Sequence, residues 1–126
     1  MPDLHLIIAR DLLTWRELQD LCTDLKHVAA HELSGIDYSG RYVTLLAPDD
    51  VDVYTFEFDP AKSATNKVAK LVVIGFDWPE RMATLKDQLG ALQQVLEVHV
   101  RAAHPDLPPI PCPVNFAPVR QDHWVY

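Results

Sequence analysis

Two long helical patterns, each preceded and followed by a strand-like segment, constrain the fold of this 126-residue chain most strongly. The first begins at Thr14 and Glu17, which have the spacing of a capping box. Its apolar residues then recur three and four positions apart as far as Leu33, and the second pattern has the same period from Met82 to Ala103. A strand, a helix and a second strand form a βαβ unit, whose two strands run parallel with a right-handed crossover.

The two predicted units span residues 2–46 and 68–117. In the first, Leu4, Leu6 and Ile8 alternate with Asp3, His5 and Ile7, and residues 41–46 are rich in β-branched and aromatic types. In the second, the dense apolar run at 68–76 is typical of a strand buried on both faces. We therefore expect an α/β fold: two βαβ units forming one mixed sheet with two long helices on one face, in a single domain, 1–126.

The segment between the units, residues 51–58, carries apolar groups on both faces of an alternating pattern. Such a segment is an aggregation risk if it stays uncovered. We interpret it as an arm that packs on a neighbouring subunit, which predicts an oligomer. Residues 118–126 are interpreted as a C-terminal tail.

The composition excludes several classes of function. A formal net charge of -7 without a cluster of basic residues argues against a nucleic-acid partner. No apolar run approaches the length of a membrane-spanning helix, and the N-terminus lacks the pattern of a signal peptide. The two cysteines, Cys22 and Cys112, have no metal or redox spacing and suit a reduced compartment, so we expect a cytoplasmic protein without a membrane partner.

The N-terminus offers a candidate catalytic group. Removal of Met1, which a small second residue permits, would leave Pro2 with a free secondary amine at the start of a strand. Burial disfavours the charged form of an amine and lowers its pKa, so that it can act as a base or a nucleophile near neutral pH. The simpler interpretation is that Pro2 only begins a strand. If Met1 is retained, the nitrogen of Pro2 is an amide and has no basicity.

Taken together, these features resemble the tautomerase superfamily, which has the macrophage migration inhibitory factor-like fold. The resemblance is carried by Met1-Pro2, by Leu71–Phe76, by Val114–Pro118 and by the aromatic tail His123–Tyr126, and it is closest to a bacterial tautomerase-like branch. It implies a homotrimer with no cofactor and no metal. It also implies a pocket between subunits, in which the N-terminal proline moves a proton and arginines bind the carboxylate of a small keto or enol acid.

The resemblance assigns roles to individual residues. Pro2 matches the catalytic proline by position, and Arg41 matches an arginine that opens the second strand of small tautomerases. Arg10 lies near another family arginine, but the Asp11 that follows it departs from the family pattern. Arg81 is a pseudo-symmetric candidate. Arginine suits these roles because its guanidinium binds both oxygens of a carboxylate at once.

Three functions remain open from the sequence: a tautomerase or isomerase, a lyase, decarboxylase or hydratase that uses the same proline, and a non-catalytic trimeric binding protein. His27 and His31 have the i, i+4 spacing of a two-histidine metal pair. Their polar neighbours favour a solvated helix face instead, so no metal site is predicted.

Overall fold

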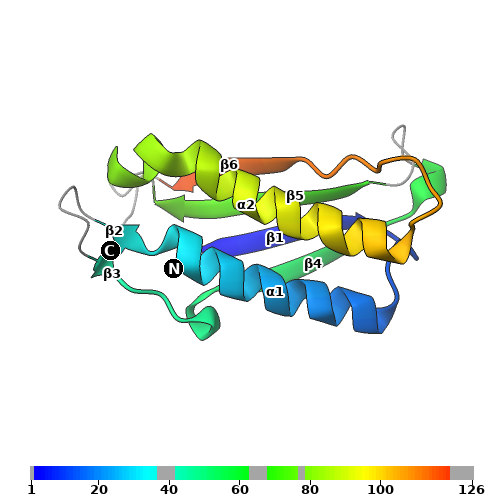
Figure 1. Ribbon diagram of the computed structural model, residues 1–126, viewed down its shortest axis with the longest axis horizontal. Helices are drawn as coiled ribbons and strands as arrows, with labels where there is room; N and C mark the ends of the chain where they lie inside the picture. Colours follow the sequence, from blue (N-terminus) through cyan, green and yellow to red (C-terminus); the bar gives the residue numbers. More distant parts are fainter. Residues whose placement is uncertain (1, 37–41, 63–67, 77–78, 120–126) are drawn as a thin grey trace.

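The chain folds into a four-stranded mixed sheet with two long helices packed against it (Figure 1). A computed structural model describes residues 2–36, 42–62, 68–76 and 79–119. The helices are α1 (Trp15–Leu33) and α2 (Pro79–Ala103), and the single-turn 3₁₀ helices are η1 (Pro48–Asp50) and η2 (Pro60–Lys62). The strands are β1 (Asp3–Ala9), β2 (Gly35–Ile36), β3 (Tyr42–Thr44), β4 (Asp52–Phe58), β5 (Ala69–Phe76) and β6 (Val114–Val119).

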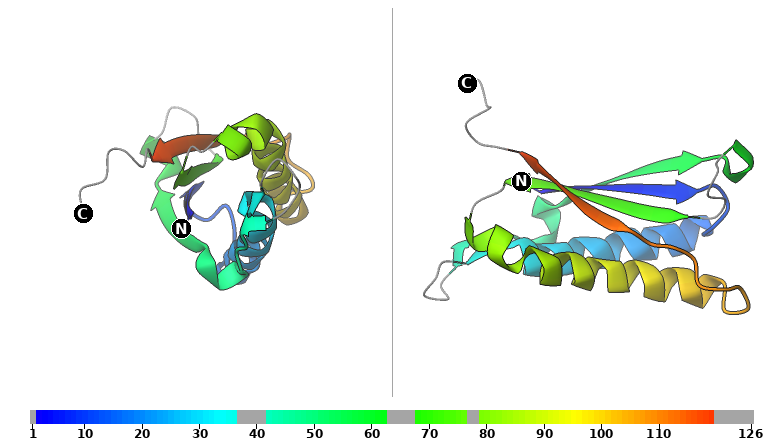
Figure 2. Two further views of the ribbon diagram at one scale, coloured as in Figure 1. Left: turned by 90° about the vertical axis from the view of Figure 1, so that its left-hand side faces the viewer. Right: turned by 90° about the horizontal axis from the view of Figure 1, so that it is seen from above.

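The topology is that of two βαβ units joined through their first strands. The strand order is β4-β1-β5-β6, with β1 parallel to β4, β5 parallel to β6, and β1 antiparallel to β5. Both helices lie side by side on the same face of the sheet, as the two views of Figure 2 show. The expected fold class, with two βαβ units and two helices on one face, is therefore confirmed.

The core lies between this face of the sheet and the two helices. In β1, Leu4 and Leu6 are fully buried and Ile8 is nearly so, whereas the alternate side chains are only partly buried. This follows from the period of two in a strand, which sends successive side chains to opposite faces. Val51, just before β4, is also fully buried, and the helices and β5 contribute the other large, fully buried side chains of the core: Leu21, Leu25, Leu33, Leu71, Val73, Leu92 and Leu96.

The prediction for residues 41–58 was wrong in its strand pairing. The segment interpreted as an arm contains β4, which pairs with β1 along its whole length, from Asp3 opposite Asp52 to Ala9 opposite Phe58. The first unit therefore ends at β4 rather than at residue 46. The segment at 41–46 contributes only β3, which pairs with β2 in a separate antiparallel sheet. Both faces of β4 carry apolar side chains, and each face has its own contacts. Val53 packs against the core under the helices, whereas Tyr54 and Phe56 contact the ring of His5 on the opposite face of the sheet.

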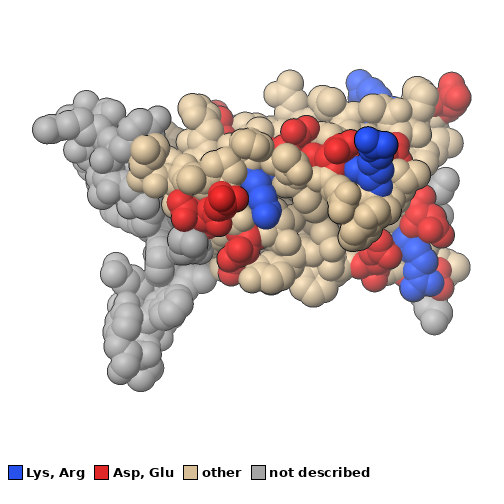
Figure 3. Space-filling model, turned by 90° about the horizontal axis from the view of Figure 1, so that it is seen from below, with Lys and Arg blue, Asp and Glu red and all other residues tan. Residues whose placement is uncertain are grey.

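Charged side chains of both signs are mixed on one face of the molecule (Figure 3). On the face drawn in Figure 3, lysine and arginine side chains are isolated among acidic ones. Among the described helices, none has the length and apolar character that crossing a bilayer requires.

Helix α1 begins with the predicted capping box. The Glu17 backbone N–H donates to Thr14 Oγ1 at 3.2 Å, and the Thr14 backbone N–H donates to Glu17 Oε1 at 2.8 Å. The hydrogen bond from the Thr14 backbone is the main cause that lowers the pKa of the Glu17 carboxyl. A depressed carboxyl pKa stabilises the fold above the unfolded-state pKa, and this contribution disappears as the pH falls through the folded-state pKa.

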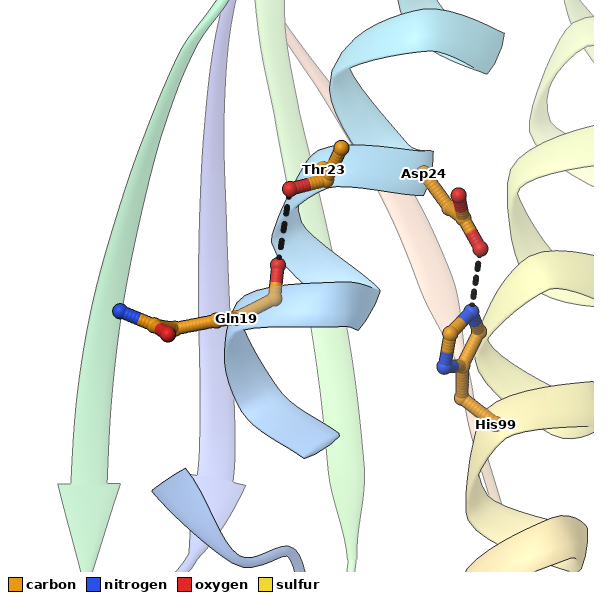
Figure 4. Close-up of polar contacts among 4 residues, drawn as sticks. All are labelled: Gln19, Thr23, Asp24 and His99. Carbon is orange, nitrogen blue, oxygen red and sulfur yellow. Dashed lines mark hydrogen bonds and ion pairs between the residues drawn. The ribbon is translucent and has the colours of Figure 1, made fainter. Parts of the chain in front are cut away.

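We expect Thr14→Ala to lower the free energy of unfolding by about 1 kcal/mol, because it removes the cap acceptor. Thr23→Ala, on the same helix, is the matched control: Thr23 Oγ1 donates to the Gln19 carbonyl at 3.0 Å within the helix (Figure 4), and alanine there should change stability by about 0.5 kcal/mol or less. Urea denaturation at neutral and acidic pH measures both. Equal effects of the two substitutions would contradict the cap assignment.

Candidate active site

Pro2 lies at the start of the central strand and is buried. The next residue, Asp3, is in register with Asp52 of β4 and with Ile74 of β5. If the same register continues by one residue, Pro2 lies opposite Val51 on one side and Gly75 on the other, and both are buried. Two neighbouring strands thus enclose the position from either side. A proline costs nothing at the first position of a strand because no ladder donor is required there.

Several described elements end or begin at the same end of the molecule as Pro2. Figure 1 shows there the ends of β5 and β6, the end of α1, the start of α2 and the β2–β3 pair. The start of a long helix carries the positive end of its dipole and favours anions. The end of α1 at the same place carries the negative end of its own dipole, so the two helix ends offset each other there (Figure 1).

Two of the other predicted site residues lie in the sequence at the starts of different elements, β3 and α2. Arg41 lies outside the described residues. It precedes β3 of the small sheet, so it does not open the strand that pairs with β1. Arg81 lies in the first turn of α2 at the Pro2 end, and its side chain also lies outside the described part.

Arg10 does not lie beside Pro2 in the same protomer. It is exposed, and its backbone N–H donates to the Phe58 carbonyl at 2.8 Å, just beyond the far end of β1. Eight residue steps along a strand at ~3.3 Å each separate the two positions by roughly 26 Å. The pairing of Arg10 with Pro2 in one pocket therefore requires a second subunit.

Two buried polar side chains in the helical layer were not anticipated. Ser34 caps the end of α1, where its hydroxyl donates to the Ala30 carbonyl at 2.6 Å and accepts from the Leu46 backbone at 3.0 Å. Gln88 in α2 is 8% exposed, and its amide nitrogen donates to Thr84 Oγ1 at 2.7 Å. Its Oε1 is buried and has no hydrogen-bond partner among the described residues. The sequence signal for Gln88 was its position one and two turns before Leu92 and Leu96, on the apolar stripe.

His5 and His99 each contact other side chains of the fold. His5 lies on the open side of the sheet, with its ring centroid 5.5 Å from that of Tyr54 and 5.4 Å from that of Phe56. His99 Nε2 lies 2.6 Å from Asp24 Oδ2, which connects α2 to α1 (Figure 4). Neither contact places a base beside Pro2.

The thiols and the candidate metal pair do not form a reactive centre. Burial raises the pKa of the Cys112 thiol to about 11 and raises that of Cys22 as well, so both stay protonated at neutral pH. His27 and His31 are exposed. Within the described residues, no group of three or more histidine, cysteine or acidic side chains is arranged to hold a metal ion.

Solved structures with the same fold cover almost the whole chain, although the sequence matches no protein-family model and no curated protein. A macrophage migration inhibitory factor-like protein from Entamoeba histolytica has a TM-score of 0.67 at 9% identity over 99% of this chain and 94% of its own. A fused 4-OT wild-type asymmetric trimer has a TM-score of 0.63 at 12% identity, covering 98% and 91%.

A malonate semialdehyde decarboxylase inhibited by 3-bromopropiolate has a TM-score of 0.63 at 8% identity, covering 98% of this chain and 87% of its own. At such low identities, the likeness concerns the fold alone. The three proteins share the duplicated βαβ architecture that this chain has in β1–α1–β4 and β5–α2–β6. The chain therefore has the fold of the tautomerase superfamily.

Proposed function

We propose that this protein is a cofactor-independent tautomerase or isomerase, whose N-terminal Pro2 acts on a small unsaturated keto or enol acid after Met1 is removed. The observation that carries the proposal is the burial of Pro2, with Met1 still attached, immediately before the inner strand β1 of a tautomerase-like fold. Removal of one residue would expose a secondary amine at this position. A desolvated amine has a lowered pKa, which suits a group that must both accept and return a proton.

In the proposed reaction, Pro2 takes a proton from carbon or oxygen of the substrate and returns it at another position. Negative charge develops on the enolate oxygen in between, and cationic donors stabilise it. Arg41 is the proposed partner of the substrate carboxylate, and Arg10 of the partner subunit is the proposed donor to the enolate.

A homotrimer would bring these residues together. The face of the sheet opposite the helices carries Ile7, Tyr54, Phe56, Val72 and Ile74 beside Asp3, His5 and Lys70. Of these, Tyr54 and Phe56 are 48% and 51% exposed. The right-hand view of Figure 2 shows that both helices lie on the other side. Within the described residues, the sheet ends at β4 on one side and at β6 on the other, and a fused 4-OT of this fold is a trimer. An apolar face and sheet edges favour association of copies.

We expect light scattering after size exclusion to give about three times the mass of one chain. Phe56→Glu should shift the protein toward monomer, because it places a charge on the apolar face of the sheet. Gln94→Glu is the control, since it adds the same charge at an exposed position of α2, on the other side of the sheet (Figure 2). A wild-type protein that is monomeric at every concentration would remove the proposed intersubunit pocket.

Intact mass and nitrogen-15 NMR of Pro2 test the catalytic group directly. We expect a mass without Met1 and a pKa of the Pro2 amine below that of an exposed secondary amine, because burial disfavours the charged form. Turnover of phenylenolpyruvate and 2-hydroxymuconate then tests the reaction. A mass that includes Met1 would exclude Pro2 as the base.

A decarboxylase is the second candidate function, and it is supported by the malonate semialdehyde decarboxylase of the same fold. Both reactions pass through an enolate and need the same cationic donors. Release of carbon dioxide from a 3-oxo acid, measured with the same preparation, distinguishes the two.

A further inference from the structure

A cavity lies at the end of the molecule remote from Pro2, between the last turns of α2 and the proline-rich connection to β6 (Figure 1). Its volume is about 330 Å³, and its walls include Glu97, Arg101, His104, Leu107 and Pro109. This volume is at the small end of the range for small-molecule sites. None of its lining residues takes part in the proposed tautomerase reaction.

The walls of the cavity are held in place by defined contacts. The His104 backbone N–H donates to the Val100 carbonyl at 3.0 Å, and the Leu107 backbone N–H donates to the His104 carbonyl at 3.3 Å. The His104 ring donates through Nε2 to the Leu12 carbonyl, which ties this wall to the β1–α1 connection. Prolines on the opposite wall have a fixed φ. Because these walls are already held in place, they lose little conformational entropy when a ligand binds.

The charges in the cavity are one cation and one anion that do not neutralise each other. Glu97 and Arg101 are exposed and stand one helical turn apart, yet neither forms an ion pair within the described residues. Val100, Leu107 and Ile110 supply apolar surface beside them. A ligand that fits this arrangement has a carboxylate, an ammonium group and an apolar body.

We propose that this cavity binds a free amino acid with an apolar side chain, with its carboxylate on Arg101, its ammonium group on Glu97 and its side chain against the proline-rich wall. Arg101 also lies in the last turn of α2, where a cation stabilises the negative end of the helix dipole. A purely structural role for Arg101 predicts lower stability on substitution and no effect on a ligand. The two roles are therefore separable by experiment.

The experiment is an NMR titration of the nitrogen-15-labelled full chain with L-phenylalanine, 3-phenylpropanoate and phenethylamine. We expect shifts of backbone amides between residues 97 and 110 with L-phenylalanine, at a Kd of about 1 mM because both charges are solvated. The two analogues lack the amine or the carboxylate, and each should bind about fivefold more weakly.

Two substitutions assign the contacts. Arg101→Gln should weaken L-phenylalanine about fivefold and leave phenethylamine unchanged, whereas Glu97→Gln should weaken L-phenylalanine and spare 3-phenylpropanoate. Lys86→Gln and Asp87→Asn, exposed positions nearer the start of α2, are the matched controls. Equal binding of all three probes, indifference to both substitutions, or shifts confined to the Pro2 end would each overturn the proposal.

Discussion

A variant with one leucine inserted between Met1 and Pro2 should lose the proposed tautomerase activity by about 100-fold or more. A bulky second residue blocks removal of Met1, so the nitrogen of Pro2 stays an amide and cannot accept a proton. General acid–base catalysis contributes about 100-fold to 10,000-fold to a rate, which sets the size of the expected loss. Initial rates on phenylenolpyruvate and 2-hydroxymuconate measure it.

Pro2→Ala is the informative companion to the insertion. Met1 is still removed before alanine, and a primary amine remains at the same place. We expect the rate to fall by about tenfold without vanishing, because the base is retained with a different pKa and less rigidity. If the wild type, Pro2→Ala and the insertion variant share one slow rate on both substrates, the enzyme proposal is wrong and a non-catalytic binding protein is favoured.

Local patterns in the sequence predicted the parts of the fold that local physics determines. The capping box at Thr14 and the helical stripe that follows it give α1 its start and its buried face. Alternation in residues 4–8 correctly predicted that Leu4 and Leu6 point into the core. These features depend on residues a few positions apart, whose periods of 3.6 and 2 are visible in the sequence.

The strand pairing of residues 41–58 could not be predicted in the same way. Two short apolar segments follow α1, and either could pair with β1. The choice depends on contacts between distant residues, such as those of the fully buried Val51, which leads into β4. The first segment turns back on Gly35–Ile36 instead. Local propensity does not distinguish these outcomes.

The candidate site was predicted only in part for a related reason. Pro2 follows from its position at the terminus, and its burial agrees with the strand pattern. That Arg10 assists Pro2 stays a prediction: the two residues lie roughly 26 Å apart within one protomer, so the expected pocket between subunits has to bring them together. Contacts between subunits join residues that are far apart in the sequence, so no local sequence pattern predicts them.

Leu6→Ala should lower the free energy of unfolding by about 3 kcal/mol, the largest effect on stability that we expect from a single truncation. Leu6 is fully buried in the central strand, in register with Leu71 of β5 and Thr55 of β4. Truncation removes the transfer free energy of the lost atoms and leaves a cavity, because neighbours on both sides are fixed by strand pairing.

Leu45→Ala is the matched control, since the same atoms are removed from a side chain that is 71% exposed. Its effect should stay within about 0.5 kcal/mol. Urea denaturation at one fixed protein concentration compares the two variants, because association of subunits adds a concentration-dependent term to stability. An unchanged denaturant slope would assign the difference to stability itself. Equal losses for Leu6→Ala and Leu45→Ala would contradict the position of the core between β1 and the helices.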